Sequence, residues 1–183
     1  MVALVAMLGI GCSSSDSSRT NRTVDEVFNE GFEAYEDGDY EEALARFDVI
    51  KLQYPTSKYA DDSQYYIADI NRRREEYVLA AFNYSLVRRS FPSSEWAKES
   101  TFKIAECYEA LILPIDRDQE YTVKAIRAYT DFQNVYPTDS LTLEAASKIH
   151  ELRGRLAERY LVIAEHYVTT LSKRAALVYY DQI

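Results

Sequence analysis

The chain has 183 residues, which allows one ordinary domain or one short array of repeats. Acidic residues outnumber basic ones by 30 to 21, and a net charge of −9 argues against a protein that binds nucleic acid through a basic surface. The apolar fraction of 47% is enough for a core, whereas glycine and proline are scarce, at 5 and 4 residues. This composition predicts an all-α protein rather than a sandwich, a barrel or a dinucleotide-binding fold.

The N-terminal segment has the pattern of an exported lipoprotein. Residues 1–11 are apolar but too short to span a bilayer as a helix, so they are interpreted as the remnant of a signal peptide. Cys12 follows directly, and the polar, serine-rich stretch after it reads as a flexible tether. We therefore expect residues 12–23 to hold a lipidated Cys12 and a tether, with palmitate-type acyl chains as the only membrane anchor.

The rest of the chain repeats itself. Tyr54-Pro55, Phe91-Pro92 and Tyr136-Pro137 each close an amphipathic segment, at intervals of 37 and 45 residues. Periods in this range are typical of stacked helical hairpins. We therefore predict an α-solenoid of about four hairpins over residues 24–183, with an irregular helical bundle as the alternative. The predicted repeats span residues 24–57, 58–93, 94–138 and 139–183, the last of them truncated.

The first unit resembles the tetratricopeptide motif. Gly31 and Ala43 allow two antiparallel helices to approach closely, Gly38 permits the turn between them, and Pro55 ends the second helix. Four units in this register predict a tetratricopeptide-like array. Cys107 falls within a helix of the third unit, where we expect a small buried residue outside any disulfide. Eight extra residues, 113–120, lengthen the loop of that unit.

The order of these features is similar to that of the BamD family, the tetratricopeptide lipoproteins of the outer-membrane β-barrel assembly machinery. The stretch Leu152–Glu158 resembles a segment of that family that opens the fourth repeat, and Phe47–Ala60 resembles its first repeat junction. The resemblance implies an adaptor on the periplasmic face of the outer membrane. Its partners would be the periplasmic domains of the barrel-forming subunit, other assembly lipoproteins, and the C-terminal signals of unfolded outer-membrane proteins.

Catalytic and metal-binding patterns are weak in this chain. His150 and His166 stand 16 residues apart on one expected helix, which is not a chelating spacing, and no phosphate-binding or nucleophile motif occurs. We therefore expect no enzyme activity, no cofactor and no metal site. The alternative to barrel assembly is a periplasmic scaffold for cell-envelope or peptidoglycan enzymes.

Binding is left as the function, and repeat geometry predicts where it occurs. The first helix of each hairpin lines the concave groove of a tetratricopeptide array, and side chains one or two turns apart point into it. Arg72 and Arg73 beside aromatic rings suit a peptide that ends in an aromatic residue and a carboxylate. The two alternatives are that the rings pack under neighbouring helices and that the arginines pair with nearby acids. The predicted groove residues are Phe28, Phe32, Tyr35, Tyr65, Asp69, Arg72, Arg73, Phe102 and Glu106.

Charge is unevenly distributed along the chain. Residues 25–62 carry twelve acids and three bases, a net charge of −9, whereas residues 63–183 are close to neutral. The excess is expected to repel anionic lipid, and either to attract basic partners or to keep the first repeat soluble. Arg153, Arg155 and Arg159 form a basic set in the fourth repeat. By the family resemblance, this set is the expected interface with the barrel-forming subunit.

Overall fold

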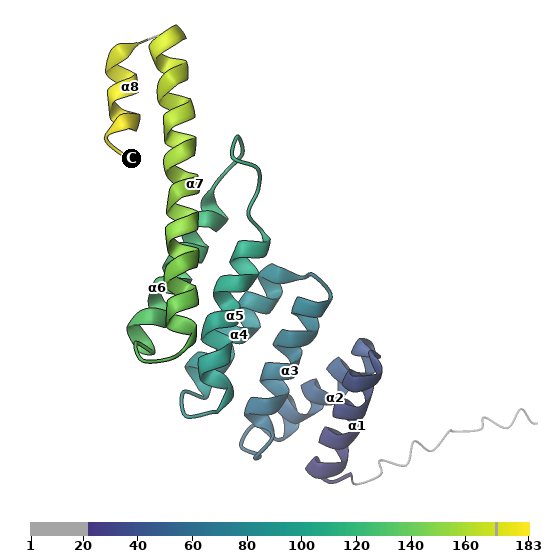
Figure 1. Cartoon of the computed structure of the whole chain (residues 1–183). Helices are drawn as coiled ribbons and strands as arrows, with labels where there is room; N and C mark the ends of the chain where they lie inside the picture. The colour runs from purple at the N-terminus through teal and green to yellow at the C-terminus, as the bar shows by residue number, and fades with distance from the viewer. Residues whose placement is uncertain (1–21, 171) are drawn as a thin grey trace, which may run out of the picture.

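The computed structural model describes residues 22–170 and 172–183, and within them every regular element is an α-helix. Consecutive helices pack as antiparallel hairpins that stack side by side, so the all-α solenoid predicted from the repeats is confirmed (Figure 1). The helices are α1 (Val24–Asp37), α2 (Tyr40–Gln53), α3 (Ala60–Arg73), α4 (Tyr77–Ser90), α5 (Trp96–Ala110), α6 (Glu120–Val135), α7 (Leu141–Thr170) and α8 (Lys173–Tyr180).

Local sequence signals explain the first hairpin. Thr23 caps α1 in a capping box, in which its hydroxyl accepts from the Glu26 amide and the Glu26 carboxylate accepts from the Thr23 amide. Gly38 ends the helix with φ at 79°, a left-handed conformation that suits glycine. A Cβ on Gly31 would come within 2.8 Å of the Arg46 Cβ, so glycine is needed where α1 crosses α2.

Each hairpin repeats the same buried positions. Ala43, Ala80 and Ala125 of the second helices have no exposed surface, and neither do Phe47 and Tyr84 one turn further on. Small residues at the crossing let the helices approach, and the ring one turn later fills the space beside them. The core is therefore continuous along the array, because small and large side chains alternate at the same buried positions in successive hairpins.

Cys107 lies within this core. Only 1% of its surface is exposed, as expected from the sequence, and its thiol is free. Burial raises the pKa of the Cys107 thiol to about 12. Cys12 lies outside the described residues.

At the first two junctions, equivalent hydrogen bonds join neighbouring hairpins across 34 residues. The Tyr59 hydroxyl donates to Asp25 at 2.9 Å, and at the next junction the Trp96 indole donates to Asp62 at 2.6 Å. The four first helices α1, α3, α5 and α7 follow one another along the array, so these bonds connect equivalent edges (Figure 1). Adjacent hairpins are therefore joined by polar bonds as well as by apolar packing.

The fourth hairpin differs from the others because α7 is 30 residues long, against 14 or 15 for the other first helices. Its first half packs on α6, and α8 lies beside its second half, away from α6 (Figure 1). Tyr167 stacks on Tyr179 of α8 with 5.5 Å between the ring centres. No helix in the described part of the chain is both long and apolar enough to cross a membrane.

Candidate functional site

An aromatic cluster covers the junction of α1 and α3. Phe28 stacks on Tyr59 with ring centres 4.1 Å apart, and Phe32 meets the edge of Tyr66 at 5.3 Å. Tyr35 lies 4.9 Å from the same Tyr66 ring. Phe28, Phe32 and Tyr66 are only partly buried, so the cluster presents an apolar surface to solvent. The rings pack against the neighbouring hairpin and also keep an exposed side. Both interpretations from the sequence, packing under neighbouring helices and lining a groove, therefore apply.

Asp69 of α3 is the polar centre beside this cluster. The carboxylate is 3% exposed and accepts from the Tyr35 hydroxyl at 2.6 Å and from the Tyr84 hydroxyl at 3.0 Å. Arg72 donates to it through Nε at 2.9 Å and Nη2 at 2.7 Å, and Arg73 donates through Nε at 2.7 Å. Three hairpin elements, α1, α3 and α4, therefore meet at one carboxylate.

The donors around Asp69 determine its ionisation. Burial alone would raise the pKa of the carboxyl, but the bonds from Tyr35, Arg73 and Arg72 outweigh burial and lower the pKa to about 2. Burial and the bond to Asp69 also raise the pKa of the Tyr35 hydroxyl. At neutral pH the site therefore holds an ionised Asp69 and a neutral Tyr35.

Two guanidinium groups share this single carboxylate, so the site keeps a surplus of one positive charge. The side chains of Arg72 and Arg73 are 33% and 44% exposed, and the Arg73 guanidinium lies 4.6 Å from the centre of the Tyr35 ring. Arg74 pairs with two carboxylates, Glu41 at 2.7 Å and Glu76 at 3.2 Å, so the surplus is confined to Arg72 and Arg73 around Asp69. The pairing of Arg72 and Arg73 with Asp69 is the alternative that the sequence left open.

The structure differs from the sequence prediction at Tyr65 and Phe102, which were expected to line the groove. Tyr65 is 6% exposed, stacks on Trp96 at 4.1 Å and donates to Glu99 at 2.6 Å. Phe102 is 4% exposed and packs edge-on against two rings of α6. The side of a first helix on which they lie is covered by the next helices of the array. Neither ring is therefore available to a ligand.

Glu106 is partly buried and pairs with Lys103 at 2.9 Å, apart from the Asp69 cluster. The structure thus brings together five of the predicted groove residues beside Phe28: Phe32, Tyr35, Asp69, Arg72 and Arg73. Sequence reasoning missed Tyr66, which contacts the rings of both Phe28 and Phe32. Its position seven residues after Tyr59, two helical turns on, is the signal that could have identified it.

The predicted partner-interface arginines have different surroundings. Arg155 donates to the Leu113 carbonyl, and Arg159 donates to the carbonyls of Ile115 and Arg117, all in the loop between α5 and α6. Arg153 is exposed. Two of the three arginines therefore hold this loop against α7, and only Arg153 presents its charge outward.

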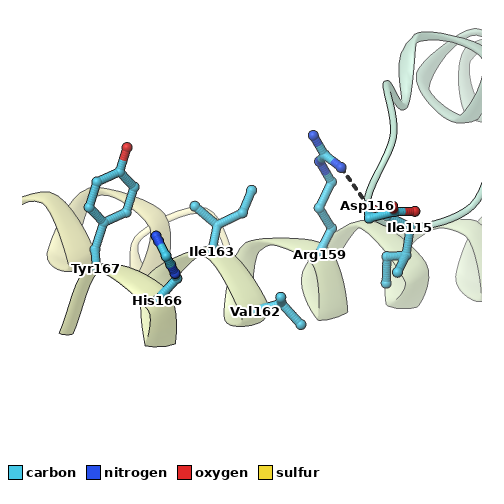
Figure 2. A pocket seen from close by; sticks show the side chains of 7 residues that line it. All are labelled: Ile115, Asp116, Arg159, Val162, Ile163, His166 and Tyr167. Atoms are coloured by element: carbon cyan, nitrogen blue, oxygen red, sulfur yellow. Dashed lines mark hydrogen bonds between the residues drawn. The ribbon is translucent and has the colours of Figure 1, made fainter. Parts of the chain in front are cut away.

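Between this loop and the second half of α7 lies a pocket of about 410 Å³. Figure 2 shows Arg159 reaching across from α7 to the loop at one end of the pocket. Ile163 and Val162 supply apolar surface, and the lining is predominantly apolar. The pocket is lined by Ile115, Asp116, Arg159, Val162, Ile163, His166 and Tyr167. Residues 22–170 and 172–183 contain no group of three His, Cys, Asp or Glu side chains placed to hold a metal ion.

Comparisons with known proteins agree on one family. The profile of the YfiO family, described as "Outer membrane lipoprotein", matches residues 20–182. A Haemophilus influenzae protein named outer membrane protein assembly factor BamD is 24% identical over 184 residues, covering 95% of this chain and 69% of that protein. Proteins of the same name from Pasteurella multocida and Caulobacter vibrioides are 23% and 24% identical, and the chain spans 67% and 58% of their lengths.

Proposed function

This chain belongs to the YfiO family of outer membrane lipoproteins, and we propose that it is a non-catalytic adaptor in the assembly of outer-membrane β-barrel proteins. Three relatives that bear the name of an assembly factor support this proposal. In this proposal the protein is held at the periplasmic face of the outer membrane by acyl chains on Cys12. It receives unfolded barrel proteins and contacts the other subunits of the assembly machinery.

The observation that carries the proposal is the surplus positive charge beside an exposed aromatic surface. Arg73 is the more exposed arginine, and only its Nε is engaged by Asp69. Its remaining N–H groups can therefore donate to a second carboxylate. Phe28 and Phe32 lie one turn apart on α1 and offer their partly exposed rings to an aromatic side chain. A peptide that ends in an aromatic residue with a free carboxylate matches both features.

The strength expected of such binding is modest. An aromatic ring buried against Phe28 and Phe32 contributes about 1–3 kcal/mol. The bond from Arg73 to the terminal carboxylate contributes about 1–2 kcal/mol, since water reaches the guanidinium. Ordering a flexible peptide opposes both terms, which leaves roughly micromolar affinity or weaker. A receptor that passes its client onward is served by weak binding.

A second contact is assigned to the end of the array. Arg153 is exposed on α7, and the apolar pocket beside Arg159 lies two turns further along the same helix. We assign this region to the periplasmic domains of the barrel-forming subunit. A charge and a recessed apolar surface on one rigid helix support this assignment, because they suit the polar rim and the apolar centre of a protein interface.

Peptide titration tests the first contact. A fluorescent ten-residue peptide that ends in Phe is titrated as the free acid and as the C-terminal amide, and we expect the acid to bind about tenfold more tightly. Arg73→Gln should remove this difference while circular dichroism shows that the helices stay folded, although loss of the bond to Asp69 lowers the unfolding midpoint. Arg153→Gln is the matched control on a distant helix and should leave the difference unchanged. Equal affinity for acid and amide would contradict recognition of the carboxylate.

Isolation of the membrane-bound protein tests the wider role. Copurification with a large outer-membrane barrel protein is the expected result, and Arg153→Glu should reduce the yield of that partner. Copurification with cell-wall enzymes alone would instead favour a scaffold for peptidoglycan enzymes.

A further inference from the structure

The outer face of α4 carries an apolar surface that the hairpin core does not use. Val78, Leu79 and Phe82 are 56%, 47% and 54% exposed, and they lie together on one and a half turns of the helix. We call these three residues the α4 patch. Single exposed apolar residues are common on proteins, but three on adjacent turns form a contiguous surface.

The other hairpins show that the fold does not require apolar residues at these positions. The equivalent residues of α2, aligned through Ala43 and Ala80, are Glu41, Glu42 and Ala45. The equivalent residues of α6, aligned through Ala125, are Val123, Lys124 and Arg127. All of these helices pack in the same way, so the hydrophobic character of the α4 patch is specific to the second hairpin.

A basic cavity adjoins the α4 patch on the side of α6. It has a volume of about 270 Å³ and is lined by Ser85 and Arg88 of α4 and by Lys124, Arg127 and Asp131 of α6, among others. The Ser85 hydroxyl donates to the carbonyl of Phe82 at 2.7 Å, so the patch and the cavity share the same turn of α4. The cavity therefore begins one turn along α4 from Phe82, and the three patch residues lie outside its lining.

The cavity lacks enough acid to balance its bases. Arg88 reaches Asp131 only at 4.0 Å, and Lys124 pairs with Glu120 at 2.6 Å. Among the described residues, Arg127 has no ion-pair partner within 4.0 Å, and it lines the cavity. The recessed surface therefore favours an anionic group of side-chain size.

We propose that the α4 patch and the adjoining cavity bind an acidic amphipathic helix of a partner protein. The partner's apolar side chains would cover Val78, Leu79 and Phe82, and a carboxylate of the same helix would enter the cavity beside Arg127. A helix that lays its apolar face on another protein presents side chains at this spacing. The charge of the cavity selects the acidic partner over a basic one.

The shape of the surface disfavours a lipid bilayer as the occupant. The basic groups line a recess rather than a protruding plane. A flat bilayer could not bring its headgroups into this recess while also covering Phe82.

A pair of labelled peptides tests the proposal on the full chain. One is an 18-residue helical peptide with leucines on one face and glutamates beside them, and the other carries lysines in place of the glutamates. We expect saturable binding of the acidic peptide and at least about tenfold weaker binding of the basic one. Phe82→Ser and Arg127→Gln should each weaken the acidic peptide about tenfold. Ala45→Ser, at the position of α2 equivalent to Phe82, is the matched control and should have no effect.

Four results would overturn the proposal. The first is equal binding of both peptides, and the second is binding that Phe82→Ser leaves unchanged. The third is Phe82-dependent adsorption to phosphatidylglycerol vesicles with no peptide binding, which would assign the patch to a lipid surface. The fourth is a concentration-dependent mass in light scattering that Phe82→Ser abolishes, which would assign it to a second copy of the chain. Circular dichroism of each variant confirms that the exposed substitutions leave the helices intact.

Discussion

Asp69 shows how much of one side chain's role depends on residues distant in sequence. Spacing along α3 is enough to suggest that Arg72 and Arg73, three and four residues later, can pair with it. The hydroxyls of Tyr35 and Tyr84 reach the same carboxylate from 34 residues before and 15 residues after it. The side chains of Tyr35 and Tyr84 help to enclose the carboxylate, and no local sequence pattern indicates either contact. The sequence could therefore suggest the ion pair but not its burial.

Asp69→Asn should destabilise the protein by about 3 kcal/mol at pH 7, as expected when one partner of a buried ion pair is removed. The pKa of Asp69 is about 2 in the folded protein, below its ordinary value of 3.8. The contribution is therefore complete above pH 3.8 and is lost as the pH falls towards 2. Urea unfolding at pH 7 and at pH 3 should show a gap between the native protein and the variant that narrows in acid.

Asp131→Asn is the control for this measurement, because its carboxylate is exposed and pairs with Arg88 only at 4.0 Å. It should change the free energy of unfolding by less than about 0.5 kcal/mol. A gap for Asp69→Asn that stays constant from pH 7 to pH 3 would contradict the assigned ionisation.

At the scale of the element, the turns of the first two hairpins repeat one geometry with different residues. Gly38 and Glu75 both have positive φ, at 79° and 61°, and they stand 37 residues apart. The hydrogen bonds also correspond, since Asp39 donates to the Ala34 carbonyl and Glu76 donates to the Asn71 carbonyl, each at 2.8 Å. The same left-handed helix end is therefore formed by glycine in one hairpin and by glutamate in the next.

Glu75→Gly should raise the free energy of unfolding by about 0.5–1 kcal/mol, because glycine adopts this conformation without a steric penalty. Gly38→Ala is the reciprocal variant and should lower it by about 1 kcal/mol for the same reason. Thermal and urea unfolding measure both changes. Opposite signs are the expected outcome, and destabilisation by Glu75→Gly would show that the glutamate side chain contributes more than its backbone strain costs.

The loop between α5 and α6 depends on α7 for its conformation. Gln119 is buried and donates to the carbonyls of Pro114 at 2.9 Å and Arg117 at 3.2 Å, so the loop is partly held by its own residues. Arg155 and Arg159 then attach it to α7. Sequence reasoning correctly identified an insertion in this unit. It could not predict that two arginines some 40 residues later would bind the loop's carbonyls.

Arg159→Ala should loosen this loop and open one end of the pocket on α7. Two backbone carbonyls lose their charged donor, which costs about 1–2 kcal/mol locally. Hydrogen exchange of the amides of residues 111–119 should accelerate, while the amides of α3 and α4 keep their protection. Arg153→Ala, an exposed arginine on the same helix, should leave the loop unchanged. Unchanged exchange in Arg159→Ala would mean that Gln119 and Arg155 suffice to hold the loop.

The long helix α7 marks the limit of the sequence prediction for the fold. The repeat register correctly predicted stacked hairpins, because buried alanines and closing prolines recur at regular intervals. The predicted fourth repeat, 139–183, contains the 30-residue helix α7 and the short helix α8, so its first helix is about twice as long as those of the other repeats. Gly154 within that helix gives no clear stop, since an isolated glycine weakens a helix without ending it. Helix continuity here is decided by packing on α6 and α8.

At the scale of the whole molecule, the array has few contacts between distant hairpins. Each hairpin packs on its neighbours, so stability is the sum of the hairpins and of the junctions between them. The junction of the second and third hairpins contains Trp96, the only tryptophan of the chain. Tyr65 stacks on this indole and donates to Glu99 at 2.6 Å. Trp96 fluorescence therefore reports on this junction, whereas circular dichroism reports on all helices.

Tyr65→Phe should weaken this junction while leaving the ring stacking in place. The variant removes the bond to Glu99 and should lower the coupling of the two hairpins by about 1.5–3 kcal/mol, the range for a hydrogen bond to a charged group. In a linear array, a weaker junction lets the two sides unfold separately.

In urea, Trp96 fluorescence and circular dichroism should change together in the native protein. In Tyr65→Phe the fluorescence change should come at lower urea than the loss of helix. Tyr121→Phe, on α6 and remote from this junction, should keep the two transitions together. Coincident transitions in Tyr65→Phe would mean that apolar packing alone couples the hairpins.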